Sequence, residues 1–347
     1  MDIYTIPVRY QDSFSNLDEF KLISKIIDQL GSSAAKDIIV PPGDDAAVWM
    51  NSKNSLTVAT VDTLTEGTHW RADTMSFYDV GWRAITASVS DLAAMGATPN
   101  YLLIAITLDT STTEQNINML TEGIAKSSTV HKVKIAGGDI TRAHTNIISV
   151  TAIGQITQNN PQSNYYPIMR RNTAEVGEFV AVSGYPGTSG AGLNILEANI
   201  QGTLDAELIT LHRQPIARIE LGVSAAKAGI KCAIDLSDGL VQDLEHIAKA
   251  SNIGIKIDTR KIPLHSTAYN LLGEQKTLDL ALGQGGEDFE LILTGSEQHL
   301  RSLHTIELPV TIIGKTTLKH PGQVKVYKGT DEEYDPPQRG WNHLRND

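Results

Sequence analysis

Apolar residues recur along this chain with two alternating periods, one typical of helices and the other of strands. Residues 78–95 favour a helix that Gly96 and Pro99 end. Residues 101–108 follow as a buried strand, and a second helical pattern covers residues 117–124. Such alternation predicts a mixed architecture of helices and strands.

The length and the position of a polar segment predict two domains. A chain of 347 residues exceeds the usual domain size of about 100 to 200 residues. Residues 157–165 are polar and proline-interrupted, so the expected domains are 1–157 and 158–347. Beyond the boundary, residues 179–183 predict a strand and 184–192 a glycine-rich turn. The expected fold class is α/β, of the α+β kind, because both halves mix helix and strand patterns.

The termini and the single cysteine favour a cytoplasmic protein. The N-terminal segment lacks a basic stretch followed by an apolar one, and no apolar run approaches the ~20 residues that span a bilayer. An amphipathic helix is expected over residues 17–30. Cys232 lies in an apolar run and is expected to be a buried strand residue, so a zinc site of several thiols is excluded. No membrane partner is expected.

The net charge argues against nucleic acid as a partner. It is -11, and no block of lysine or arginine reverses the resulting field locally. If the ligands are nevertheless phosphates, divalent cations held by carboxylates have to screen them.

Aspartates at the ends of predicted elements, most of them beside glycine or serine, are the main candidates for such a role. The strand predicted over residues 56–61 ends on Asp62, the segment 133–136 leads to Asp139, and Asp91 lies late in the first helix. The full set is Asp44, Asp45, Asp62, Asp91, Asp139, Asp235 and Asp238. Any one of them alone fits a cap or a turn better than a site. Together they match several magnesium ions around a polyphosphate, since each ion takes only one or two carboxylates.

Other nucleotide-binding signatures are absent from the sequence. The Gly314-Lys315-Thr316 triplet has Pro309 where a P-loop has its first glycine. No Gly-x-Gly-x-x-Gly follows a strand, and the His-Arg-Asp signature of protein kinases is missing.

The aspartate segments, taken in order, resemble the thiamine-monophosphate kinase family. The segments are Gly43-Asp44-Asp45-Ala46-Ala47, Asp62-Thr63-Leu64, Gly67-Thr68-His69-Trp70, Ser90-Asp91-Leu92-Ala93-Ala94-Met95-Gly96-Ala97, Gly137-Gly138-Asp139, Asp235-Leu236-Ser237-Asp238-Gly239-Leu240 and Gly285-Gly286-Glu287-Asp288-Phe289-Glu290-Leu291. The resemblance implies two α/β domains of the aminoimidazole ribonucleotide synthetase type, with the N-terminal domains forming a β-barrel-like interface in a homodimer. It also implies ATP and thiamine monophosphate as substrates and thiamine diphosphate as product.

The resemblance assigns roles to individual positions. It implies magnesium ligands at Asp45, Thr60, Val61, Asp62, Asp91, Asp139, Asp235 and Asp238. Nucleotide contacts are implied at Gly138, Asp139, Arg171 and Ser237, and contacts with thiamine monophosphate at His69, Glu287 and Trp341. At Val61, where threonine is frequent, only the backbone carbonyl can ligate, and His131 departs from the usual aromatic residue.

The acceptor needs no general base. A phosphate monoester has a second pKa of ~6, so it is mostly a dianion at neutral pH and already a nucleophile. Catalysis is therefore expected to consist of positioning and charge neutralisation, without an acid, base or nucleophile from the chain. Two alternatives stay open, an ATP-dependent synthetase of the same superfamily and a non-catalytic nucleotide or thiamine-binding regulator.

Overall fold

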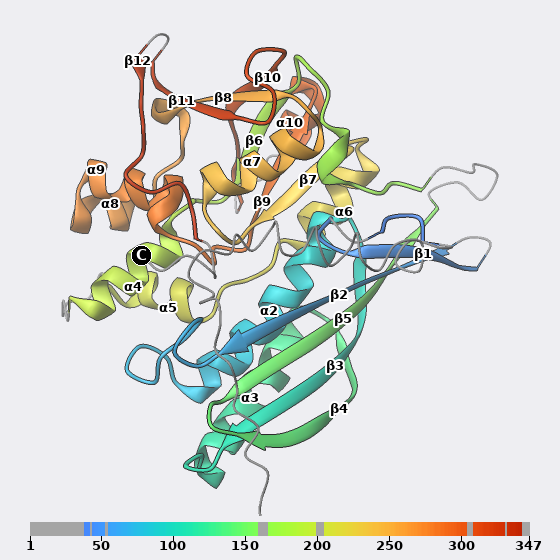
Figure 1. Ribbon diagram of the computed structural model, residues 1–347, viewed down its shortest axis with the longest axis vertical. Helices are drawn as coiled ribbons and strands as arrows, with labels where there is room; N and C mark the ends of the chain where they lie inside the picture. Colours follow the sequence, from blue (N-terminus) through green and yellow to red (C-terminus); the bar gives the residue numbers. More distant parts are fainter. Residues whose placement is uncertain are drawn as a thin grey trace, which may run out of the picture. The chain divides into compact units, whose positions relative to one another are not determined.

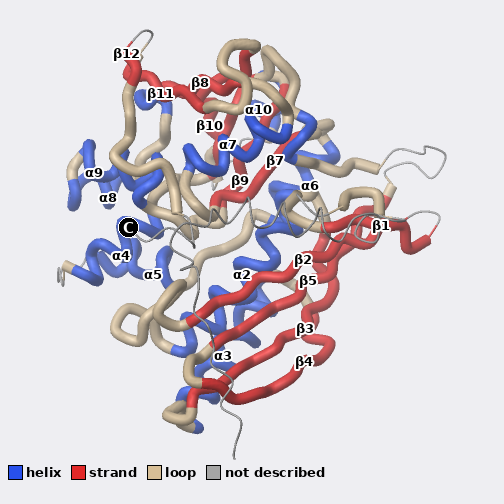
Figure 2. The backbone as a smooth tube through the Cα atoms, viewed as in Figure 1, coloured by secondary structure: helices blue, strands red, loops and turns tan. Residues whose placement is uncertain are grey.

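The computed structural model describes residues 38–41, 44–52, 55–158, 166–198, 205–303, 308–329 and 332–341. Residues 37–341 belong to one compact unit. Their strands form two separate sheets, which carry the labels β1 to β5 and β6 to β12 (Figure 1, Figure 2). The helix predicted over 17–30, Gly43 and most of the connection 157–165 lie outside the described residues.

The first sheet has five strands in the order β1-β2-β5-β3-β4. The strands are β1 (Ala47–Ser52), β2 (Ser55–Thr65), β3 (Thr98–Asp109), β4 (Lys134–Ala143) and β5 (Ile147–Thr157). Only β3 and β4 pair in parallel. The helices α2 (Phe77–Ala94) and α3 (Glu114–Val130) lie on one face of this sheet (Figure 1). A capping box between Ser76 and Asp79 begins α2.

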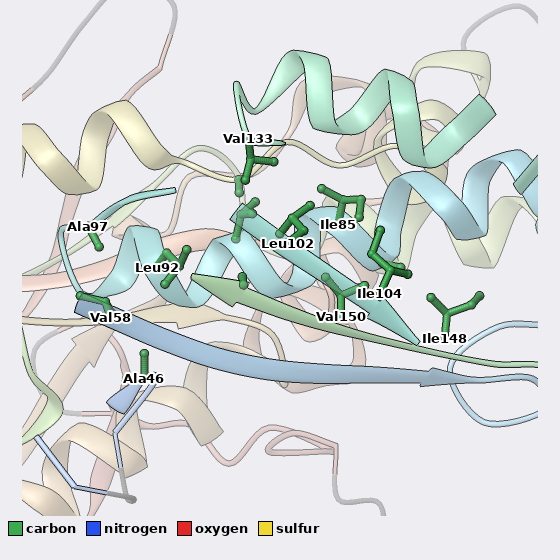
Figure 3. Close-up of a cluster of buried hydrophobic side chains, with 14 of the residues drawn as sticks. Ala46, Val58, Ile85, Leu92, Ala97, Leu102, Ile104, Val133, Ile148 and Val150 are labelled. Carbon is green, nitrogen blue, oxygen red and sulfur yellow. The ribbon is translucent and has the colours of Figure 1, made fainter. Parts of the chain in front are cut away.

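The core of this half lies between the sheet and its helices. In β2 every second residue points toward α2, so Leu56, Val58 and Leu64 are buried. They pack with residues of α2, β3 and β5, several of which Figure 3 labels. Thr60 and Asp62 occupy the same row of β2, which places two polar side chains at the edge of an apolar core.

The second sheet has seven strands in the order β12-β11-β8-β10-β6-β9-β7. They are β6 (Phe179–Ser183), β7 (Cys232–Leu236), β8 (Gly254–Asp258), β9 (Glu290–Gly295), β10 (Val310–Thr317), β11 (Val324–Lys328) and β12 (Glu332–Glu333). The helices of this half are α4 (Thr188–Glu197), α5 (Asp205–Arg213), α6 (Ile219–Lys227), α7 (Leu240–Ala250), α8 (Ser266–Leu272), α9 (Glu274–Asp279) and α10 (Glu297–Ser302). Only β8 and β11 pair in parallel, and Cys232 is buried in β7 as predicted.

Close packing joins the two halves along α2. The contact between α2 and α6 leaves no room for a side chain at Gly222, where a Cβ atom would lie 2.0 Å from the Ala93 carbonyl oxygen. A hydrogen bond from Trp82 Nε1 to the Pro215 carbonyl, 2.7 Å long, adds a polar link. Residues from both halves therefore meet around the C-terminal part of α2.

Most predicted elements are present, but three boundaries were wrong. The strand predicted to end on Asp62 continues to Thr65, because its pairing with β5 is unbroken. Asp139 was expected at the end of an element, but Gly137, Gly138 and Asp139 lie within β4 and pair with β3. The turn expected over 184–192 is shorter, since α4 begins at Thr188. In the described part of the chain no helix has the length and apolarity to cross a membrane.

Candidate active site

Four aspartates from both halves meet beside the C-terminal part of α2. We call Asp45, Asp62, Asp91 and Asp235 the aspartate cluster. Asp45 precedes β1, Asp62 lies in β2, Asp91 in α2 and Asp235 in β7. Single carboxylate oxygens of Asp45, Asp91 and Asp235 lie within 4.8 Å of one another. Asp62 is close enough to Asp91 for the two carboxyls to share a hydrogen bond.

Hydroxyl groups orient two members of the aspartate cluster. Thr60 Oγ1 donates to Asp91 Oδ2 at 2.6 Å, and Ser90 Oγ donates to Asp235 Oδ2 at 2.8 Å. Because Ser90 and Asp91 are consecutive in α2, one turn of this helix both supplies a carboxylate and holds another from the second half. The predicted metal residue Thr60 thus contacts the aspartate cluster directly.

The aspartate cluster carries excess negative charge. Burial, first of all, and the neighbouring carboxylates raise the pKa of Asp91 and of Asp235 well above the ordinary range. Burial also raises the pKa of Asp62 to about 6, and the pKa of the adjacent Asp44 to about 7. Without a cation, these raised pKa values make the ionised forms of Asp44, Asp62, Asp91 and Asp235 costly.

Among the described residues, Arg171 is the positively charged side chain that contacts these carboxylates. Its Nη2 and Nε donate to the two Asp45 oxygens at 2.6 and 3.0 Å. Its backbone N–H donates to Asp44 Oδ2 at 3.1 Å. These carboxylates raise the pKa of Arg171 in spite of its burial. One guanidinium leaves most of the charge of five aspartates uncompensated.

A second group of possible metal ligands adjoins the first. Asp238, Asp243 and His246 each offer a ligand atom within 4.8 Å of the others. One Asp243 oxygen accepts the backbone N–H groups of Ser237, Asp238 and Gly239 at 3.1 to 3.2 Å, which fixes the loop before α7. Burial and the charge of Arg171 lower the pKa of His246 to about 4, so its imidazole is neutral at neutral pH.

The loop before α7 also gathers two residues predicted to contact the substrate. The Glu287 N–H donates to the Ser237 carbonyl at 2.7 Å, and the Trp341 N–H donates to the Asp238 carbonyl at 3.1 Å. Gln242 Nε2 donates to the Trp341 carbonyl as well. The half-exposed Trp341 thus lies next to the predicted metal residue Asp238.

The third predicted substrate residue, His69, follows the end of β2. Its Nδ1 accepts the backbone N–H of Thr65 at 3.0 Å, so the turn after the strand orients the ring. His69 therefore lies C-terminal to Asp62, just past the end of the strand that carries Asp62.

Gly138 and Asp139 do not join the aspartate cluster within one chain. Register aligns Asp62, Val150, Ile104 and Gly138 across β2, β5, β3 and β4. Three interstrand spacings of about 4.8 Å separate Gly138 from Asp62. Asp139 pairs with Ala105 and points to the other face, which α2 and α3 leave bare, as does the exposed Val61.

The chemistry of this donor set fits hard divalent cations. Several buried carboxylates, a hydroxyl and too few positive charges match the oxygen ligands that Mg²⁺ takes. Sequence reasoning missed Asp243, His246 and the buried Arg83 of α2. The spacing of Asp243 and His246, three residues apart on a helix that follows Ser237-Asp238-Gly239, is the signal that could have indicated the first two.

Comparisons with known proteins identify the family. Residues 43–156 match the family model AIR synthase related protein, N-terminal domain, and residues 175–326 match AIR synthase related protein, C-terminal domain. The thiamine-monophosphate kinase of Bacillus subtilis is 30% identical over 338 residues, which cover 95% of this chain and 100% of that relative. The enzyme of Escherichia coli K12 is 33% identical over 94% of this chain and 98% of its own length. This chain belongs to the thiamine-monophosphate kinase family.

Solved structures agree with this membership. The structure described as AaThiL complexed with AMPPCP and TMP superposes with a TM-score of 0.81 at 29% identity and covers 96% of this chain and 99% of its own. The hydrogenase maturation protein HypE has a TM-score of 0.67 at 18% identity, which shows a shared fold alone. The predicted resemblance and the mixed two-sheet fold are both confirmed.

One departure from the pattern of the thiamine-monophosphate kinase family has a structural explanation. His131 is buried at the end of α3, with Nδ1 2.9 Å from the Ser127 carbonyl and Nε2 accepting the Ala217 N–H at 3.1 Å. Burial lowers its pKa, so the ring is neutral. These contacts make His131 a link between α3 and the segment before α6.

Proposed function

We propose that this chain transfers the terminal phosphoryl group of ATP to thiamine monophosphate, forming ADP and thiamine diphosphate. Family membership supports the reaction, and the undercompensated aspartate cluster carries the proposal, because it fits cations that bind polyphosphate. The test supplies the chain with ATP, Mg²⁺ and thiamine monophosphate and measures thiamine diphosphate by chromatography. An active chain that turns over ATP only with a carboxylate or amide acceptor would be a synthetase, and binding of ATP and thiamine monophosphate without turnover would identify a regulator.

The proposed magnesium ligands are Asp45, Thr60, the Val61 carbonyl, Asp62, Asp91 and Asp235, with Asp238 serving a further ion. Magnesium ions, when bound, would supply positive charge to the phosphates of ATP and to the acceptor. In that state Asp45 would no longer need Arg171 as its counter-charge. We propose that Arg171 then contacts the nucleotide phosphates, with Ser237 lining the same site.

The transfer would be direct and in line. The acceptor phosphate is already a nucleophile at neutral pH, so the chain has to hold it near the terminal phosphate of ATP and reduce their repulsion. Asp62 and Asp91 would hold metal and would not attack. Rapid quenching after mixing with γ-labelled ATP should leave no label on the protein, and a labelled aspartate would refute direct transfer.

Gly138 and Asp139 would serve the site of a second copy in a homodimer. Support comes from Asp139, which lies on the face of the first sheet that no described helix covers, near the exposed apolar side chains of Val61, Tyr101 and Leu103. Such a face favours burial against a partner. In the resulting dimer, the Asp139 of one copy would complete the magnesium and nucleotide site of the other.

Complementation tests the shared site. Asp91→Asn and Asp139→Asn, produced together with two different tags, would give mixed dimers with one intact site. These mixed dimers should regain up to about half of the wild-type activity, while each variant alone stays inactive. Inactive mixed dimers would place Asp91 and Asp139 in the same chain's site and contradict the proposal.

His69, Glu287 and Trp341 would contact thiamine monophosphate. Trp341 and Glu287 support this role because they bond to adjacent residues of one loop, and Trp341 is an aromatic residue with 46% of its surface exposed. His69→Ala should raise the KM for thiamine monophosphate more than the KM for ATP. Equal increases in the two constants would count against the assignment.

A further inference from the structure

Arg83 is an arginine of α2 whose side chain is completely buried, with a relative exposure of 0%. A charge in such a place is costly unless it is paired and hydrogen-bonded. Its Nη1 donates to Glu287 Oε2, and its Nη2 donates to the His212 carbonyl oxygen. The pair joins α2 of the first half to the segment before β9 of the second half.

Glu287 supplies the charge that compensates Arg83. The Nη2 of Arg83 also lies 3.1 Å from His212 Nδ1, but burial and the guanidinium hold the pKa of His212 well below its usual range. His212 is therefore neutral, and Ser189 Oγ lies 3.1 Å from the same ring nitrogen. Among the described residues, the ionic partner of this arginine is the Glu287 carboxylate.

The backbone around Glu287 is fixed by other contacts. Glu287 and Phe289 have φ angles of +58° and +52°, a conformation that side chains other than glycine rarely adopt. Besides the bond from Glu287 to Ser237, the Phe289 N–H donates to the Leu236 carbonyl at 2.9 Å. The Asp288 carboxylate accepts the N–H groups of Gly187 and Ser189 at 2.6 and 2.8 Å. Strain held in place by so many contacts is typical of functional segments.

With the backbone fixed, Arg83 decides the direction of the Glu287 side chain. This side chain is 29% exposed, so part of it faces outward while Oε2 is held from inside. Among the described residues, no hydrogen-bond donor is found for Oε1. A carboxylate with one oxygen held and the other available suits a ligand that offers an N–H donor or a positive charge.

We infer that Arg83 is a positioning residue, which holds the Glu287 carboxylate so that its second oxygen receives the aminopyrimidine N–H of thiamine monophosphate. This inference rests on the proposed function. Arg83 itself does not touch the substrate. Its loss should weaken thiamine monophosphate binding specifically and leave the nucleotide end of the site unchanged.

Arg218 offers a matched control. It pairs with Glu290, three residues after Glu287, through Nε and Nη2 at 2.8 and 2.5 Å. Ser183 Oγ also donates to this carboxylate, whose side chain is only 6% exposed. Glu290 is thus fully engaged inside the protein, and losing its arginine should affect stability without affecting substrate recognition.

The test compares Arg83→Met, Arg83→Lys and Arg218→Met with the wild type. Arg83→Met should raise the KM for thiamine monophosphate by about tenfold or more, the loss expected for a misdirected charged hydrogen bond. The KM for ATP should stay within about twofold. Arg83→Lys should recover part of the affinity, and Arg218→Met should leave both constants near the wild-type values. Calorimetry of thiamine monophosphate binding without ATP should reproduce the ranking.

A double-mutant cycle keeps the inference testable if Arg83→Met fails to fold. Glu287→Gln should raise the KM for thiamine monophosphate, and Arg83→Lys should then add little to it, since both changes act on one carboxylate. Additive effects, or equal increases in both KM values, would overturn the positioning role. A wild-type chain that neither binds nor phosphorylates thiamine monophosphate would overturn the proposed function, and this inference with it.

Discussion

Two groups of carboxylates in this molecule differ in how their negative charge is compensated. The aspartate cluster and the adjoining Asp44 together meet one guanidinium, that of Arg171. Glu287 and Glu290 each have an arginine of their own. The second group is electrically complete once the chain has folded. The first group has fewer positive partners than carboxylates among the described residues, which is why we propose it, and not the second group, as the magnesium site.

Of the changes that test this comparison, Asp91→Asn should have the largest effect, a loss of catalytic rate. The loss of a central metal carboxylate should reduce kcat by about 1000-fold or more, because charge stabilisation of that kind contributes several kcal/mol. The melting temperature without Mg²⁺ should stay the same or rise, since repulsion within the aspartate cluster decreases. Steady-state kinetics and calorimetry measure the two quantities. Asp109→Asn, at the end of β3 and outside the aspartate cluster, is the control for charge removal and should leave kcat unchanged.

Arg218→Met should give the opposite result. Removing the arginine leaves Glu290 buried without its partner, which costs about 3 to 5 kcal/mol of unfolding free energy. The loss should be the same with and without Mg²⁺, since Glu290 belongs to the compensated group. Denaturant unfolding measures it. A loss that Mg²⁺ restores would show that the two groups are not independent.

Magnesium should stabilise the wild type by an intermediate amount. At a concentration of 100 times Kd, one site adds about 2.7 kcal/mol through mass action. The melting temperature should therefore rise with MgCl₂ and respond much less to NaCl of equal ionic strength. Asp91→Asn should show a smaller rise. Equal responses of wild type and variant would mean that the ion binds elsewhere.

The pH dependence of the metal-free protein should show the smallest effect. Asp44 and Asp62 have folded-state pKa values of about 7 and about 6, above their ordinary value of 3.8. Between these values the folded protein retains protons that the unfolded chain has lost, so stability should decline as pH rises from about 4 to about 7. Mg²⁺ should flatten this decline. Melting curves at fixed ionic strength test it, and stability that rises over this window without metal would contradict the charge excess.

Local patterns sufficed for much of the fold. Strand β6 was predicted residue for residue, and α2 to within one residue at each end. Both predictions succeeded because periodicity and helix caps depend on residues close together in the sequence. The extension of β2 past Asp62 was missed, since it depends on pairing with β5, which lies far away in the sequence. Strand pairing is decided by partners that a single segment does not contain.

The sequence predicted which aspartates belong to the site, but it did not predict how the residues of the site contact one another. The places of these aspartates at or near the ends of predicted elements, and the family resemblance, indicated Asp45, Asp62, Asp91 and Asp235, which the structure brings together. Arg83 gave no signal, because an arginine within a helix is usually a solvated surface residue. Only the fold shows that it is buried against Glu287. Asp139 stays a prediction that depends on a second copy of the chain.

Helix α2 gives the site a fixed length. Arg83 contacts Glu287 from the N-terminal half of the helix, and eight residues later Asp91 enters the aspartate cluster. At 1.5 Å per residue, these two anchor points lie about 12 Å apart along a rigid rod. A molecule that binds at both ends must match this span. The helix therefore fixes the distance between the Glu287 end and the aspartate end of the proposed site. This fixed distance would disfavour substrates whose ring and phosphate are too close together or too far apart.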